Sequence, residues 1–181
     1  MNSLKKIKEW LNTFTSFNEQ EQVDCQHIRQ FLEEEPNLLL RDNVKMHFTA
    51  SAWVLNPSKN KVLMLYHNIY QSWSWSGGHA DGEGDLLSVA MKEVKEESGL
   101  VSLKPLSDSP ISIEILGVQP HYKKQKYVSA HLHLNYTFLL HNTKEEKLKI
   151  CPEENSKVGW LSPDEAVRSS TEAWMKPIYK K

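Results

Sequence analysis

The sequence predicts an α+β fold, because segments with helical periodicity and segments with strand-like alternation both occur along its 181 residues. Apolar residues recur at helical spacing near the N-terminus and again over residues 86–98, whereas residues 128–140 alternate between apolar and polar side chains. A chain of this length is enough for one well-packed domain plus an extension. We therefore expect an N-terminal helical extension over residues 1–42 and one α+β domain over residues 43–181.

Two helices are predicted within the extension. The first is indicated by apolar residues at helical spacing, namely Leu4, Ile7, Leu11 and Phe14. A second begins after Asn18, whose side chain can cap the helix, and Glu21 three residues later makes the start resemble a capping box. Pro36 then stops this helix.

A sheet is predicted to begin just after His47. Residues 52–55 and 62–66 are rich in apolar residues and flank a turn over residues 56–60, a pattern typical of a β-hairpin. Residues 86–98 then place Leu87, Ala90, Met91 and Val94 along one stripe, which predicts a helix. Gly99 follows as a C-terminal cap would.

Two further strands and a last helix are expected in the C-terminal half. The alternation over residues 128–140 predicts a strand with one buried face and one polar face, and residues 111–118 are its expected partner. Ser162, Pro163 and Glu165 have the order of a helix start, with Ser as the cap and Pro in the first turn.

The composition is typical of an ordinary soluble globular protein. Its 39% hydrophobic content, 25% charged content and net charge of −1 give no basic excess, so we expect no nucleic-acid polymer as a partner. No apolar run approaches the length of a membrane span or suits a signal peptide, so we expect no membrane partner either. Cys25 and Cys151 lie far apart in sequence, which favours reduced thiols and a cytoplasmic location.

An acidic patch marks the predicted helix over residues 86–98. Glu93, Glu96 and Glu97 project from one side of such a helix, beside its apolar stripe. Like charges at this spacing oppose the helix by a few tenths of a kcal/mol unless a cation lies among them. Hard ions such as Mg²⁺ take oxygen ligands of this kind. The alternative is a solvated helix face with interleaved lysines, which is the usual meaning of such a run taken alone.

The segment just upstream is unusually rich in glycine. Residues 77–84 contain four of the seven glycines in the chain. Such clustering indicates an unusual backbone path, and a glycine-rich loop that enters a helix can expose backbone groups to a phosphate or a metal. A tight turn between a strand and a helix is the alternative explanation.

Together the loop and the acidic helix resemble the Nudix box, over the 23 residues from Gly78 to Leu100. Gly78 is followed by five residues, position 84, seven residues, and then Lys92-Glu93-Val94 and Glu96-Glu97-Ser98-Gly99-Leu100. Two positions depart from the family pattern, which usually has Glu at the position of Gly84 and Arg at that of Lys92. We infer a remodelled support for the loop, in which Glu83 or Asp85 substitutes.

The resemblance implies a mixed β-sheet sandwiched between helices and a diphosphohydrolase activity. By similarity, Glu93 and Glu97 are the principal metal ligands, Glu96 assists, and the Gly77 carbonyl adds an oxygen. The implied cofactor is Mg²⁺, with Mn²⁺ as a substitute. The implied reaction is attack of water on a diphosphate linkage in a nucleoside diphosphate derivative or a similar small molecule, with Glu96 and Glu97 in the catalytic set.

Other candidate residues are each open to two interpretations. Glu154 is our candidate for the general base, because family members often take it from the loop before the last helix; a charged surface loop is the alternative. His79 lies within the glycine loop and can contact a phosphate. Trp73 and Trp75 can stack on a substrate ring, although large aromatic residues are more often in the core. The strand histidines, His131 and His133, are expected to face solvent.

Two other functions stay open at this point. One is a Nudix-fold module that binds a ligand without hydrolysing it, which the departures at Gly84 and Lys92 favour. The other is an isomerase acting on an isoprenoid diphosphate, since that activity uses a related fold. The sequence names neither the substrate nor the general base, and it leaves the oligomeric state open, with a homodimer as one option.

Overall fold

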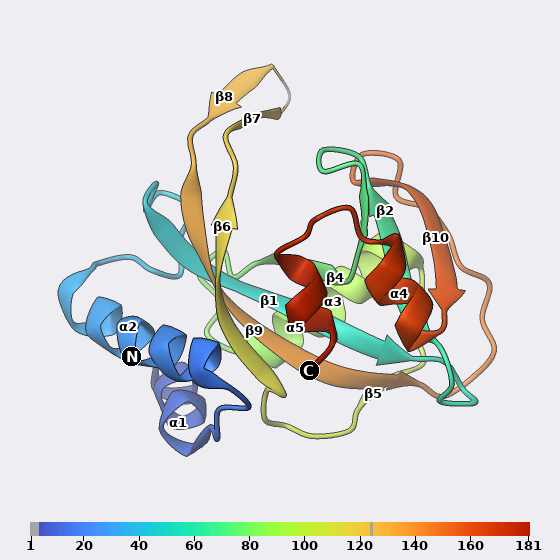
Figure 1. The fold of residues 1–181 in the computed structure, drawn as a ribbon, viewed down its shortest axis with the longest axis horizontal. Helices are drawn as coiled ribbons and strands as arrows, with labels where there is room; N and C mark the ends of the chain where they lie inside the picture. Colours follow the sequence, from blue (N-terminus) through green and yellow to red (C-terminus); the bar gives the residue numbers. More distant parts are fainter. Residues whose placement is uncertain (1–3, 124) are drawn as a thin grey trace. The chain divides into compact units, whose positions relative to one another are not determined.

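The computed structural model describes residues 4–123 and 125–181 and confirms the α+β class (Figure 1). In chain order the elements are α1 (Lys5–Thr13), α2 (Glu19–Glu34), β1 (Met46–Leu55), β2 (Val62–His67), β3 (Ser72–Ser74), β4 (Ser76–His79), α3 (Leu86–Ser98), β5 (Leu103–Pro105), β6 (Ser112–Val118), β7 (His121–Lys123), β8 (Lys126–Val128), β9 (His131–Asn142), β10 (Asn155–Leu161), α4 (Pro163–Ser169) and α5 (Met175–Tyr179).

The chain divides into two compact units. The first holds the described residues up to 50, together with 78–89 and 109–137, and the second holds 51–77, 90–108 and 138–181. This division does not follow the predicted boundary between residues 42 and 43, which stays a prediction. The two units are described in turn.

The N-terminal helices belong to the first unit. Helix α1 buries Ile7, Trp10 and Leu11, which is the apolar stripe that its spacing predicts. The cap predicted for α2 is confirmed, because the Asn18 side chain accepts the backbone N–H of Glu21 at 3.0 Å. Helix α2 then packs on β6, so the first helices share their core with the strands of the same unit.

Strands β6 and β9 form the long antiparallel ladder of the first unit, as the sequence predicts. The ladder runs from Ser112 opposite Thr137 to Val118 opposite His131. The strand expected over residues 128–140 is in fact two strands, β8 and β9, and β7 pairs with β8 as a hairpin that prolongs the ladder (Figure 1). Pro120 explains the interruption, because proline has no backbone N–H to donate to a ladder.

The first half of β1 lies beside β9 in the same direction. The Leu132 N–H donates to the Lys45 carbonyl at 2.9 Å, and the Thr49 hydroxyl donates to the Asn135 side chain at 2.9 Å. The residue numbers increase in the same direction along both strands between the first contact and the second, so β1 and β9 run parallel here. Since β9 is antiparallel to β6, the sheet is mixed, as the sequence resemblance implied.

The polar face of β9 is buried, contrary to the prediction that it is open to water. Asn135 and Thr137 are both 1% exposed, like the apolar residues that alternate with them. The Asn135 amide donates to Thr137 and to the buried Glu114 carboxylate. A layer of hydrogen-bonded polar groups therefore covers this face, which sequence alternation alone does not distinguish from solvent.

In the second unit, β2 lies between β10 and the end of β1. Gly159 pairs with Met64 in the β10–β2 ladder, and Leu55 pairs with Val62 at the predicted hairpin. Helix α4 packs near β2, β3 and β10 (Figure 1), and its predicted start is confirmed as a capping box formed by Ser162 and Glu165. No helix within the described part of the chain combines the length and the apolar character needed to cross a membrane.

Candidate functional site

Glu97 is the centre of the candidate site and lies in the last turn of α3, within the second unit. Helix α3 has the predicted bounds, and Gly99 ends it with a φ of 76°. Glu97 is buried, with only 7% of its surface exposed. The Ser76 hydroxyl and the Gly77 backbone N–H both donate to its Oε2 atom, so the chain just before the glycine loop is tied to α3.

Burial of Glu97 has a large electrostatic consequence. Desolvation raises the pKa of this carboxyl to about 8, against the hydrogen bond from Ser76, which lowers it. The nearby negative charges of Glu93 and Glu154 raise the pKa further. A buried carboxylate beside two others is costly to ionise unless a cation compensates the charge. The donor set is made of oxygens, so it fits a hard cation such as Mg²⁺.

The three predicted helix carboxylates differ in exposure. Glu97 is buried and Glu93 is half-buried. The Glu96 side chain is 56% exposed and lies 3.7 Å from the Lys92 ammonium, one helical turn earlier. The interpretation of this helix as a solvated face with interleaved lysines therefore describes Glu96, and it does not describe Glu97.

The loop that carries Glu154 is attached to the end of α3 by a residue that the sequence analysis did not single out. Asn155 is 1% exposed; its amide donates to the Glu97 backbone carbonyl at 3.0 Å and its side-chain oxygen accepts the Cys151 N–H at 3.2 Å. The structure thereby brings Glu154 into electrostatic reach of Glu97. An Asn among charged residues resembles any polar loop, so no pattern marked its role.

The two predicted substrate-binding tryptophans lie in the second unit and have different neighbours. Trp73 is on β3 and meets the Tyr66 ring edge-on, with centroids 5.9 Å apart. Trp75 follows β3 and contacts the rings of Trp53 and Tyr179 at 6.4 and 5.0 Å. Both side chains are half-buried, so each is packed on protein rings while a part of it stays accessible.

The residues at and beside the two positions that depart from the family pattern form salt bridges and hydrogen bonds. Lys92 pairs with Glu96, as described above. In the first unit, Asp85 pairs with Lys6 at 2.8 Å and its backbone N–H donates to Glu83. Asp85 therefore links the loop to helix α1, and the substitution of Glu83 or Asp85 for the usual pair stays a prediction.

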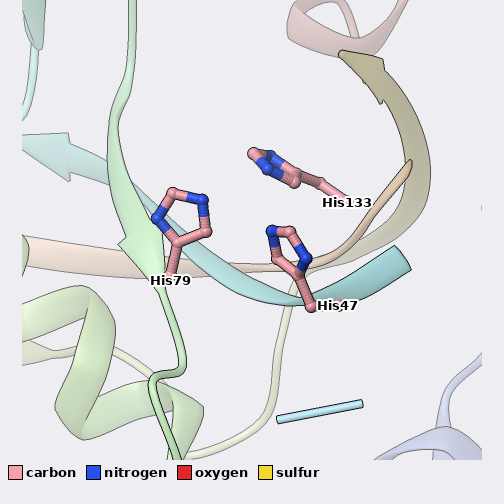
Figure 2. Close-up of side chains that lie close together, drawn as sticks. All are labelled: His47, His79 and His133. Atoms are coloured by element: carbon pink, nitrogen blue, oxygen red, sulfur yellow. The ribbon is translucent and has the colours of Figure 1, made fainter. Parts of the chain in front are cut away.

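His79, the histidine predicted at the site, lies in the first unit beside two other histidines. His79 ends β4 and its ring lies 5.0 Å from that of His133 and 5.1 Å from that of His47, between centroids (Figure 2). His133 is half-buried among these rings rather than open to water, which corrects its expected solvent exposure. His47 was not predicted, because nothing in its local sequence connects it with histidines distant in the chain.

Comparison with known proteins gives a consistent picture. The model of the NUDIX domain matches residues 45–181. Two similar solved structures are a C. elegans Ap4A hydrolase in a binary complex (18% identity, TM-score 0.56) and an E. coli dihydroneopterin triphosphate pyrophosphohydrolase (16%, 0.55); each match covers 74% of this chain and 92% of the other. A NUDIX hydrolase from Clostridium perfringens also matches (19%, TM-score 0.50), over 66% of this chain and 83% of the other. No curated protein sequence gives a significant match.

Proposed function

This chain belongs to the Nudix family, and from that premise we propose that it hydrolyses a diphosphate linkage in a nucleoside diphosphate derivative or a similar small molecule. The observation that carries the proposal is the buried Glu97 carboxyl, whose pKa is raised to about 8 beside Glu93 and Glu154. A protein that used this helix face only for solubility would have no reason to bury one of its carboxylates among others.

The proposed cofactor is Mg²⁺, for which Mn²⁺ can substitute. Four groups would hold it: the carboxylates of Glu93 and Glu97, the assisting carboxylate of Glu96, and the backbone carbonyl of Gly77. When bound, the ion would neutralise charge on the diphosphate and lower the pKa of the attacking water. The hydrogen bonds from Ser76 and Gly77 to Glu97 fix one oxygen of its carboxylate in place. A pre-positioned ligand has less conformational freedom to lose when an ion binds.

Glu154 is the proposed general base. Its carboxylate would accept a proton from water as the water oxygen forms a bond to one phosphorus and the bridging P–O bond breaks. Asn155 is a positioning residue for this step, because it ties the adjacent loop to the carbonyl of Glu97. The half-buried Glu154 is thus carried by a loop with defined hydrogen bonds, also through its own carbonyl, which accepts the Asn68 N–H at 3.0 Å.

The substrate class is proposed from both the site and the fold neighbours. Ap4A and dihydroneopterin triphosphate, the compounds in the names of two neighbours, both contain phosphoanhydride bonds and a heterocyclic ring. The accessible parts of Trp73 and Trp75 offer a surface for such a ring. His79, in the first unit, is proposed as a phosphate contact only from its position in the glycine loop of the sequence.

The test is hydrolysis of a compound panel with Mg²⁺, comparing the wild type with Glu97→Gln. The panel holds nucleotide sugars, dinucleoside polyphosphates, ADP-ribose, nucleoside triphosphates and coenzyme A. We expect turnover that requires Mg²⁺ and falls by roughly 10³-fold in the variant, because a metal-bound carboxylate is lost. Glu33→Gln makes the same change on an exposed face of α2 and should leave the rate unchanged.

Two outcomes would contradict the proposal. Equal turnover by wild type and Glu97→Gln would remove the site assignment, whatever the substrate. Tight binding of a panel compound without turnover would instead show a ligand-binding module, in line with the departures at Gly84 and Lys92.

A further inference from the structure

We propose that His47, His79 and His133 form a binding site for a transition-metal ion of the Zn²⁺ type. The three histidines lie in the first unit and come from three strands, β1, β4 and β9. One ligand nitrogen from each lies within 4.8 Å of the others, and their rings surround a common centre (Figure 2). Small side-chain rotations would bring the nitrogens to a shared ion, at the usual Zn–N distance of about 2.0–2.1 Å.

The first argument is an unsatisfied nitrogen. His47 is 4% exposed, and its Nδ1 lies 3.1 Å from the Asn43 carbonyl. A carbonyl can only accept, so Nδ1 carries the proton and Nε2 presents a lone pair. This Nε2 is buried and has no hydrogen-bond partner among the described residues. An orphaned acceptor in the core is costly, and a metal ion at the centre of the cluster would satisfy it.

The second argument is the way the ring is held. A histidine that binds a metal through Nε2 usually donates its Nδ1–H to a carbonyl or a carboxylate, which fixes the tautomer and the ring orientation. His47 has this arrangement through Asn43. The neighbouring His131 has it as well, because its Nδ1 lies 2.8 Å from the Ser129 carbonyl. His47 therefore presents Nε2 to the cluster as an acceptor without a hydrogen-bond partner among the described residues, whereas the Nε2 of His131 lies against the ring of His133.

A fourth histidine, His131, lies beside the cluster. The Nε2 atoms of His131 and His133 lie 3.2 Å apart. Two imidazole nitrogens bound to one tetrahedral zinc are separated by about 3.3 Å, given the usual Zn–N bond length. The same distance is also that of a hydrogen bond between the two rings, so His131 is a neighbour of the site, and the ligands are the three histidines whose nitrogens lie within 4.8 Å of one another.

The charge state of the cluster supports the same assignment. His47 is 4% exposed and the rings of His79 and His133 are half-buried against it, and burial of closely spaced rings disfavours their protonated forms. The rings are therefore neutral at pH 7, and neutral imidazole is the form that binds metals. A site made only of imidazole nitrogens suits Zn²⁺, Co²⁺, Ni²⁺ or Cu²⁺, whereas Mg²⁺ prefers oxygen ligands.

The experiment measures metal binding and is independent of hydrolysis. Metal-free protein is titrated with Co²⁺ and with Zn²⁺ in a large excess of Mg²⁺, which occupies oxygen sites, and the visible ligand-field absorption of Co²⁺ is recorded. We expect one Co²⁺ per chain, with the strong absorption of a tetrahedral nitrogen site, displaced by one Zn²⁺. His133→Gln should weaken binding about 100-fold or more, because it removes a ligand.

Matched variants separate this site from the carboxylates. His27→Gln changes an exposed histidine on α2 and should bind as the wild type does. Glu93→Gln removes a carboxylate ligand of the proposed Mg²⁺ site and should retain the Co²⁺ absorption, whether or not the protein hydrolyses any compound. Loss of the absorption in Glu93→Gln with retention in His133→Gln would place the ion at the carboxylates and overturn the proposal.

An X-ray absorption spectrum of the zinc-loaded wild type tests the site without any variant that might misfold. Three imidazole ligands at the usual Zn–N distance would support the proposal. A shell of oxygen ligands without imidazole scattering would overturn it, as would the failure of Zn²⁺ to bind at all in the presence of Mg²⁺.

Discussion

Burial shifts the pKa of Glu97 in the second unit and the pKa values of the buried histidines in the first unit in opposite directions. It raises the pKa of Glu97 to about 8, because the buried charged form is an anion. It lowers the pKa of His79 to about 3 and that of His133 to about 2, because the charged form of these side chains is a cation. The usual order of the two residue types is thereby reversed.

Because of this reversal, metal binding at the two proposed sites should depend on pH to different extents. Glu97 holds a proton at neutral pH in the absence of an ion, so an ion must displace that proton before it binds. The histidines have already lost theirs. Although histidine is the usual pH-sensitive side chain near neutrality, here the carboxylate has that property.

The largest effect should be the pH dependence of Mg²⁺ binding. Below about pH 8 Glu97 is protonated, so its proton competes with Mg²⁺ and the affinity rises as the pH rises. Between pH 6 and pH 8 we expect an increase of up to about 100-fold, with a plateau above. Binding of Zn²⁺ to the histidines should change much less over this range, because burial lowers the pKa of all three rings. Calorimetry at several pH values measures both, and equal slopes would abolish the contrast between the sites.

A smaller effect is expected on the stability of the metal-free protein. Because the folded pKa of Glu97 is raised, its contribution to stability is complete below pH 4.5 and is lost as the pH rises towards 8. Glu97→Gln removes the ionisable group with little change in shape. The variant should equal the wild type near pH 4.5 and exceed it by roughly 2–4 kcal/mol at pH 8.

Urea denaturation in EDTA measures this difference, with Glu33→Gln as the control on an exposed helix position. Addition of Mg²⁺ should make the wild type the more stable of the two proteins. The ion binds the folded wild type and stabilises it, whereas the variant lacks one of the carboxylate ligands. A variant that is less stable than the wild type at pH 8 in EDTA would show that the two hydrogen bonds to Glu97 outweigh its desolvation.

The sequence predicts those parts of this fold that depend on local patterns. Helix α3 was placed with its observed bounds, because an apolar stripe and Gly99 define it. The caps at Asn18 and Ser162 were predicted for the same reason, since a cap bonds within its own helix turn. Glu97 was placed at the candidate site through the Nudix resemblance.

What the sequence does not predict depends on contacts between residues distant in the chain. The polar face of β9 was expected to meet water, but Thr49 and Glu114 come from other strands to cover it. His47 and Asn155 were missed for the same reason, as each acquires its role only from a partner brought near by folding. The exposure difference between Glu96 and Glu97 is likewise set by packing, because adjacent helix residues with the same side chain look identical in sequence.

That difference gives the smallest expected effect. The Glu96 carboxylate is exposed and paired with Lys92, and exposed pairs of this kind contribute little to stability. Glu96→Gln should therefore change the free energy of unfolding in EDTA by less than about 0.5 kcal/mol, at pH 4.5 and at pH 8 alike. Urea denaturation beside Glu97→Gln measures both changes under the same conditions. Should Glu96→Gln stabilise the protein as much as Glu97→Gln does, the gain would come from relief of negative charge along α3, and burial of Glu97 would not be its cause.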